Sequence, residues 1–166
     1  MNMNLQFDSE STLTTRGASG CISTLLCCLW FVGGCGGDLP TLAPVSGIVE
    51  LDGAPISEFK NAAVSFTPQG GQLAKSTIDP KDGSFELWTY KEGDGAIVGP
   101  AKITVRATVD DPNANSEDKY PGVRWVIPDK FSDRDLSGLT CDVVPGEKNF
   151  FRIKISSDGT GTVEME

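Results

Sequence analysis

Few residues in this chain have side chains and spacing suited to catalysis. There is no histidine among its 166 residues, which excludes Ser-His-Asp and Cys-His arrangements and any zinc site that needs imidazole. Cys141 alternates with Val143 on an expected strand, and without a histidine to activate its thiol we interpret it as a small buried apolar residue. The 23 acidic residues form carboxylate pairs by chance, so a pair alone does not indicate glycosidase chemistry. We therefore expect a protein that is not an enzyme and that needs no cofactor.

Aspartates in turns are the candidate metal ligands. Asp79 and Asp82 lie in the segment 79–83, and Asp52 and Asp94 each precede a glycine in other turns. Carboxylate oxygens so placed suit a hard cation such as calcium. The spacing does not match an EF-hand loop, and aspartate followed by glycine is ordinary turn chemistry. We predict no metal site, and keep calcium binding at Asp79 and Asp82 as the less favoured alternative.

Three aromatic residues are the candidate binding residues: Trp88, Tyr90 and Trp125. Trp88 alternates with Phe85 and Leu87, which are expected to face the core, so Trp88 is expected on the opposite face. An exposed Trp88–Tyr90 platform would stack on sugar rings or dock a protein. Large apolar rings are more often covered. We therefore predict that the segment starting at Trp125 buries Trp88, with the exposed platform as the alternative.

Cys35 is the cysteine whose surroundings indicate a modification. A polar segment ending at Arg16 precedes twelve uncharged residues, 21–32. As a helix they would rise about 18 Å, which is short of the ~30 Å hydrocarbon core but has the length of a signal-peptide apolar region. The next residues complete the pattern Val32-Gly33-Gly34-Cys35. This order resembles the lipobox of bacterial lipoproteins, in which small residues precede a cysteine that accepts a diacylglyceryl group.

The lipobox resemblance implies a division of the chain. Residues 1–34 would be a lipoprotein signal peptide, and residues 35–44 the lipidated Cys35 with a tether rich in glycine and proline. The apparent disulfide set then disappears, because three cysteines would leave with the signal peptide: Cys21, Cys27 and Cys28. A secreted form cleaved without lipid and a buried core helix are the alternatives.

The charge and the anchor together define the expected partners. The net charge of −9 argues against a surface that neutralises phosphates, so we expect no nucleic-acid partner. We expect a monomer in the cell envelope, held to a membrane by lipid and facing the periplasm or the cell surface. Its partner would be an envelope protein or a glycan.

The residues from 45 to 166 indicate a single all-β domain. Apolar and polar residues alternate with a period of two, and turn sequences separate the runs. Residues 110–138 form a polar excursion with three prolines, and loops of that length are functional or disordered. Seven or eight short antiparallel strands predict a β-sandwich. The expected strands are 45–51, 62–68, 73–78, 84–90, 101–109, 139–144, 150–155 and 161–165.

Several motifs of this region resemble one family of β-sandwiches. Residues 45–56 (VSGIVELDGAPI) are similar to the opening strand and hairpin of the transthyretin-like, carboxypeptidase regulatory-like domain. Residues 64–68, 82–85 and 99–105 resemble its later strands and its Asp-Gly-x-Phe turn. Small envelope lipoproteins built from this domain also carry segments similar to residues 90–95, 127–131 and 137–140. The resemblance implies an Ig-like sandwich that serves as a structural or interaction module without a catalytic site.

Overall fold

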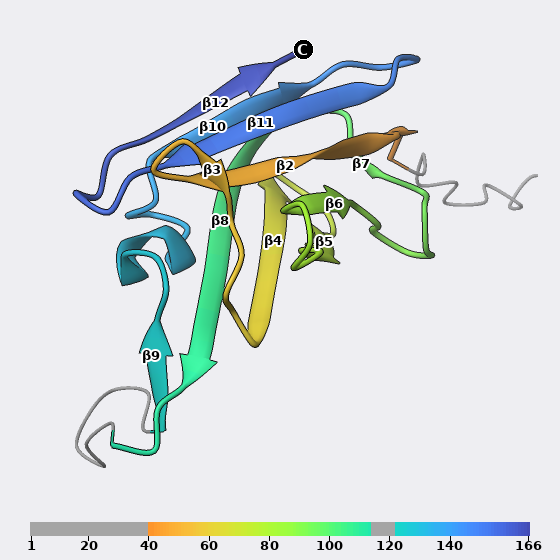
Figure 1. The fold of residues 1–166 in the computed structure, drawn as a ribbon. Coiled ribbons are helices and arrows are strands. Elements are labelled where there is room, and N and C mark those ends of the chain that lie inside the picture. Colours follow the sequence, from red (N-terminus) through yellow and green to blue (C-terminus); the bar gives the residue numbers. More distant parts are fainter. Residues whose placement is uncertain (1–39, 114–121) are drawn as a thin grey trace, which may run out of the picture. The chain divides into compact units, whose positions relative to one another are not determined.

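Short strands make up most of the part of the chain that the structure describes, residues 40–113 and 122–166 of a computed structural model (Figure 1). The all-β prediction is confirmed for these residues, which form twelve strands and one 3₁₀ turn. No helix among them is long and apolar enough to cross a bilayer. The elements are β1 (Leu42–Ala43), β2 (Val45–Leu51), β3 (Ala54–Pro55), β4 (Asn61–Pro68), β5 (Ala74–Thr77), β6 (Ser84–Glu86), β7 (Ala96–Ile97), β8 (Gly99–Asp110), β9 (Val123–Trp125), η1 (Asp129–Ser132), β10 (Leu139–Val143), β11 (Asn149–Ile155) and β12 (Gly161–Met165).

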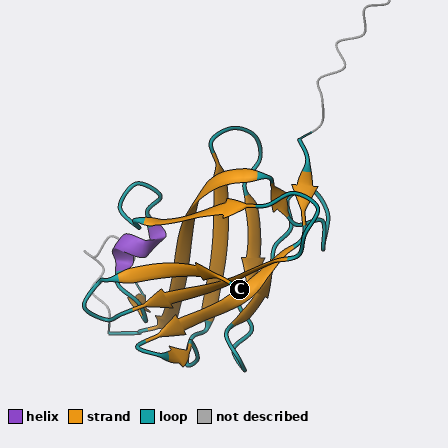
Figure 2. Ribbon diagram, turned by 90° about the horizontal axis from the view of Figure 1, so that it is seen from above, coloured by secondary structure: helices purple, strands orange, loops and turns teal. Residues whose placement is uncertain are grey.

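Two five-stranded sheets enclose one hydrophobic core (Figure 2). The first sheet has the order β10-β8-β4-β5, with β9 paired to β8. The second has the order β12-β11-β2-β3, with β6 paired to β2. A separate two-stranded sheet pairs β1 with β7. Strand β1 therefore lies within residues 35–44, which the sequence assigned to the tether.

All strand pairings in the described residues are antiparallel except for one, so the predicted antiparallel sandwich is confirmed only in part. Strands β2 and β11 run parallel, with Val45 opposite Asn149 and Leu51 opposite Ile155. Parallel neighbours require a crossover rather than a hairpin. Between β2 and β11 the chain forms the strands of the first sheet as well as β3 and β6 of the second, and β11 then runs beside β2 in the same direction.

The predicted alternation of buried and exposed residues is confirmed in the long strands. In β8, the side chains of Ile103, Val105 and Ala107 are fully buried, while the residues between them are at least partly exposed. Strands β2, β4 and β11 alternate in the same way. The two sheets meet at Phe66 of β4, whose ring centroid lies 5.6 Å from that of Phe151 and 6.2 Å from that of Phe85.

Part of the expected polar excursion belongs to the core. Strand β9 extends the first sheet, because Val123–Trp125 pairs with the end of β8. Next, η1 turns the chain so that Phe131 is completely buried, and Ile127 is also buried. The burial of Ile127 and Phe131 was not predicted from the sequence, because they lie within a mostly polar segment and the position of η1 determines that their side chains face the core. Residues 114–121 of the excursion lie outside the described part.

Gly47 is the position at which a side chain would disturb the sheets most directly. A Cβ atom there would lie 2.0 Å from the carbonyl oxygen of Phe151 and 2.6 Å from Cζ of Phe85. Both distances are far below van der Waals contact, and a backbone carbonyl cannot rotate away as a flexible side chain does. The pairing of β2 with β11 therefore requires glycine at this position.

We predict that Gly47→Ala lowers the free energy of unfolding by about 3 kcal/mol, because the added methyl group overpacks the contact between β2, β11 and Phe85. Urea unfolding followed by circular dichroism measures the change. Gly70→Ala is the matched control, since a Cβ atom at Gly70 would meet nothing within 4 Å. We expect the control to change stability by no more than about 0.5 kcal/mol. Equal stabilities for the two variants would contradict this account of Gly47.

Candidate functional site

Trp88 lies where the chain passes from one sheet to the edge of the other. After β6, the backbone N–H of Leu87 donates to the carbonyl of Val45 in the second sheet, at 2.9 Å. Trp88 then pairs with Lys75 of β5 in the first sheet, through reciprocal backbone hydrogen bonds of 2.9 and 3.1 Å. Because Leu87 is buried while Trp88 is half-buried, the crossing leaves the indole at the edge of the sandwich.

Trp125 does not cover Trp88, so the predicted burial beneath residues 125–127 is wrong. Trp125 pairs with Thr108 of β8, whereas Trp88 is bridged to β5, and β4 lies between β8 and β5 in the sheet. Instead, the ammonium group of Lys75 lies over the indole of Trp88, with Nζ 4.5 Å from a ring centroid. A cation at this distance is attracted to the electron-rich ring face. Trp88 and Trp125 are separated because of the order of the strands in the sheet, and the alternation of polar and apolar residues does not predict that order.

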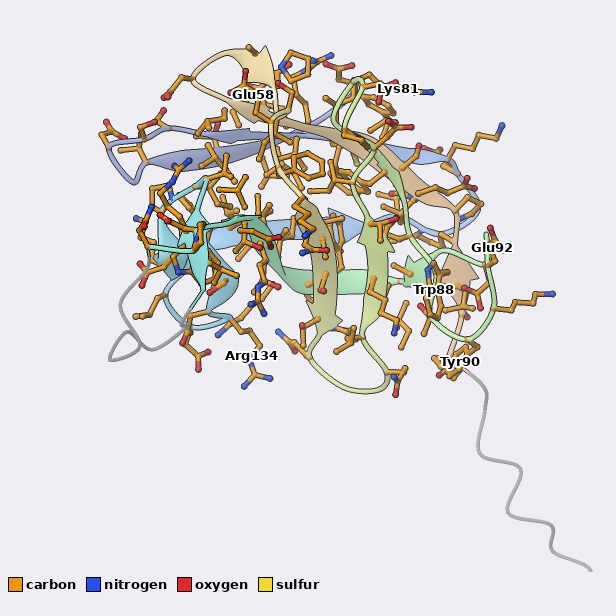
Figure 3. All side chains as sticks on the ribbon, turned by 60° about the horizontal axis from the view of Figure 1, so that its bottom comes forward. Glu58, Lys81, Trp88, Tyr90, Glu92 and Arg134 are labelled. Atoms are coloured by element: carbon orange, nitrogen blue, oxygen red, sulfur yellow. The ribbon has the colours of Figure 1, made fainter. Side chains whose placement is uncertain are left out.

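Trp88 and Tyr90 line one groove of about 510 Å³ (Figure 3). Tyr90 is the more accessible of the two, with 58% of its surface exposed. Carboxylate and hydroxyl groups share the groove with the rings, which gives it acceptors and donors beside apolar surface. This combination suits a polyhydroxylated ring or a peptide. The sequence indicated the two aromatic residues but not the polar ones, which come from β5, β6 and the following loop: Ser76, Thr77, Glu86, Lys91 and Glu92.

The side chain of Asp94 holds the loop that presents Tyr90. Its carboxylate accepts backbone hydrogen bonds from Thr89, Tyr90 and Lys91, at 2.7, 3.0 and 2.9 Å. The hydroxyl of Thr89 donates to the carbonyl of Gly95 at 2.7 Å, which closes the same loop. Burial disfavours the charged carboxylate, but the three donors outweigh it and hold the pKa of Asp94 below its usual value. Asp94, which the sequence analysis identified as a turn residue, thus stabilises the loop that contributes Tyr90 to the candidate site.

Asp79 and Asp82 serve as hydrogen-bond acceptors within their own turn. A carboxylate oxygen of Asp79 accepts the N–H of Lys81 at 2.8 Å, and one of Asp82 accepts the N–H of Ser84 at 2.9 Å. Hydrogen bonds from Ser84 lower the pKa of Asp82. Among the described residues, no group of three or more cysteine, aspartate or glutamate side chains is placed to hold a metal ion.

Cys141 lies half-buried beside a second groove, of about 440 Å³, whose lining includes Lys102 and Arg134. Burial, reinforced by the neighbouring charge of Asp142, raises the pKa of the thiol to about 12. The thiol is therefore protonated at neutral pH, and its reactive thiolate form is scarce. The four residues of the expected lipobox lie outside the described part of the chain: Val32, Gly33, Gly34 and Cys35.

We predict that Asp94→Asn loosens the loop of residues 89–95 and lowers the free energy of unfolding at pH 7 by about 1–2 kcal/mol. The three N–H donors use both carboxylate oxygens, whereas the asparagine amide has one acceptor oxygen, so at least one donor loses its partner. The contribution has a defined pH dependence. Since the folded pKa lies below the unfolded value, the stabilisation is present above about pH 4 and is lost as the pH falls through the folded pKa.

Urea unfolding at pH 7 and pH 3 tests this prediction, together with the fluorescence of Trp88 in a Trp30→Phe and Trp125→Phe background. The variant should differ from the natural protein at pH 7, and the difference should shrink at pH 3. Asp142→Asn, at an exposed position of β10, is the matched control and should leave the Trp88 signal unchanged. A constant difference at both pH values would show that the charge of Asp94 does not hold the loop.

Comparisons with models of known protein families, with curated proteins and with solved structures find no match to this chain. The all-β architecture is therefore established by the strands and their register alone.

Proposed function

We propose that this protein is a non-catalytic lipoprotein of the cell envelope. In this proposal Cys35 anchors the chain to a membrane, and a β-sandwich of the transthyretin-like type serves as a structural or protein-interaction module. The observation that carries the proposal is the order of segments: an apolar run at 21–32, two glycines, Cys35, and then a β domain whose first strand begins at Leu42.

The chemistry of the domain supports a role without catalysis. The thiol of Cys141 is held protonated by burial. The carboxylates of Asp79, Asp82 and Asp94 accept hydrogen bonds from backbone N–H groups of their own loops, so their lone pairs already stabilise the fold. The chain contains no histidine to act as a general base near neutral pH.

A lipid anchor would supply the membrane attachment that the domain's charge does not. The full chain's net charge of −9, of which residues 1–34 contribute −1, disfavours adsorption to an anionic bilayer. A diacylglyceryl group carries two acyl chains, and two chains are enough for stable anchoring. The domain would thus remain an acidic, water-exposed body held at the surface through its N-terminal side.

We predict that the full chain, expressed in a bacterium that processes lipoproteins, yields a mature protein that begins at Cys35 and carries acyl groups. Mass spectrometry of the N-terminal peptide and partitioning into detergent measure this outcome. Cys35→Ser should remain unprocessed or soluble. Cys141→Ser is the matched control and should partition like the natural protein. A natural chain that stays in the aqueous phase with residue 1 intact would refute the anchor.

A carbohydrate-binding module is the second candidate function, because Trp88 and Tyr90 share a groove with Glu86, Glu92 and Ser76. Aromatic rings stack on the apolar faces of sugars, while carboxylates and hydroxyls bind their hydroxyl groups. The Lys75 ammonium already lies over the indole of Trp88. A sugar that stacks on the same face would have to displace it.

If the groove binds sugars, Trp88→Ala should weaken binding to a hit from a glycan array at least tenfold, or about 1.4 kcal/mol. Titration calorimetry measures the affinity of each variant. Trp125→Phe is the control, since Trp125 lies on β9 and does not line the groove. An array without hits, or equal affinities for the natural protein and Trp88→Ala, would remove this candidate.

A further inference from the structure

Two exposed apolar side chains lie on segments that are bridged to one another. Leu73 is 39% exposed and Tyr90 is 58% exposed, and they are two of only four large hydrophobic residues exposed in the described part of the chain. The antiparallel bridge between Lys75 and Trp88 brings their segments together. Leu73 lies two residues before Lys75, and Tyr90 lies two residues after Trp88. Paired exposed apolar residues are more informative than scattered ones, because soluble surfaces tend to avoid contiguous apolar patches.

This pair lies at the end of the domain where the described chain begins. The loop of residues 89–95 packs there, because a Cβ atom at Gly95 would lie 1.9 Å from the carbonyl oxygen of Ala43 in β1. The loop that leads to Leu73 packs there too, since a Cβ atom at Gly71 would lie 2.8 Å from Cδ1 of Ile97 in β7. Figure 3 shows Trp88, Tyr90 and Glu92 on the same side of the domain. We call this region, formed by β1, β7 and residues 70–73 and 89–95, the β1 end.

Chain length keeps the β1 end close to the proposed anchor. Five peptide units separate Cys35 from Pro40, the first described residue. Even a fully extended chain of that length spans no more than about 18 Å. A lipid on Cys35 would therefore hold the β1 end near the bilayer surface, and a weak contact would then act at a high effective concentration.

The side chains of the β1 end suit the interfacial region of a bilayer. Tyrosine prefers the membrane–water interface, because its ring is apolar and its hydroxyl group remains hydrated. Leu73 adds aliphatic surface beside it. The charges of Lys91 and Glu92 offset each other, as do those of Glu147 and Lys148, which precede the β11 residue that binds Pro44. Asp94 adds one negative charge, and its carboxylate accepts hydrogen bonds from backbone N–H groups of its own loop. The contact would thus depend on apolar burial rather than on anionic lipids.

We infer that the anchored protein inserts Leu73 and Tyr90 into the headgroup region of the bilayer, so that the β1 end faces the membrane. This inference rests on the lipid anchor proposed above, and a sugar platform at Tyr90 would exclude it. The orientation has a consequence for function. Strand β8 leads away from β7 over twelve residues, or about 36 Å. The loops at the opposite end would therefore be presented to partners well away from the membrane.

Fluorescence quenching in vesicles tests the inference. Tyr90→Trp and, as the matched control, Leu136→Trp are each made in the full chain carrying Trp88→Phe and Trp125→Phe. Leu136 is 65% exposed and precedes β10. Trp30 lies within the expected signal peptide, so each processed chain retains one tryptophan. The lipidated proteins are reconstituted into phosphatidylcholine vesicles that contain brominated acyl chains. We expect the tryptophan at position 90 to be quenched at least twice as strongly as the one at 136.

A second pair of variants tests the two side chains themselves. With Trp88 as the only reporter, in the Trp125→Phe background, the double variant Leu73→Ser and Tyr90→Ser should lose at least half of the quenching, while Leu136→Ser should not. Circular dichroism checks that each variant is folded. Equal quenching at positions 90 and 136 in a chain whose mass includes acyl groups would overturn the inference and leave the anchor intact. A chain that carries no acyl group would overturn both proposals.

Discussion

The contact between the two sheets depends on the parallel pairing of β2 with β11, and this pairing depends on the absence of a side chain at Gly47. Gly47 lies opposite Phe151 in the register, and the ring of Phe85 occupies the space that a side chain at 47 would need. Phe85 and Phe151 both pack against Phe66 of the first sheet. Glycine at one position thus allows three aromatic rings from both sheets to form the centre of the core, where aliphatic side chains from the long strands surround them.

Polar contacts hold the register of this parallel pair at both of its ends. At the start, the buried amide of Asn149 bonds the backbone of Val144 and the carbonyl of Pro44. At the other end, the carboxylate of Asp52 accepts hydrogen bonds from the N–H and the hydroxyl of Ser157, which lower its pKa. A parallel pair has no hairpin to set its register, so side-chain contacts of this kind substitute for one.

The candidate site forms where residues 87 and 88 pass from the second sheet to the edge of the first. Leu87 bonds to the second sheet and Trp88 to the first, so the crossing itself leaves the indole at the edge. Asp94 then ties the following loop to the backbone of residues 89–91. Aromatic surface, carboxylates and the start of the described chain therefore gather at one end of the domain, which is why the anchor, the groove and the exposed pair Leu73 and Tyr90 can be considered together.

The short strands β1, β3, β7 and β9 were not predicted, and the expected strand 84–90 ends at Glu86. Local patterns sufficed for the longer strands and several turns, because alternation with period two and an Asp-Gly pair such as Asp52-Gly53 have one favoured local conformation. They also sufficed for the proposed lipidation of Cys35, which depends on contiguous residues. Strand order, the parallel pair, the burial of Phe131 and the separation of Trp88 from Trp125 were decided only in the tertiary structure. The same holds for Glu86 and Glu92, which reach the groove from separate segments. Each of these depends on which distant segment becomes a neighbour, and a pattern with a range of a few residues carries no information about that choice.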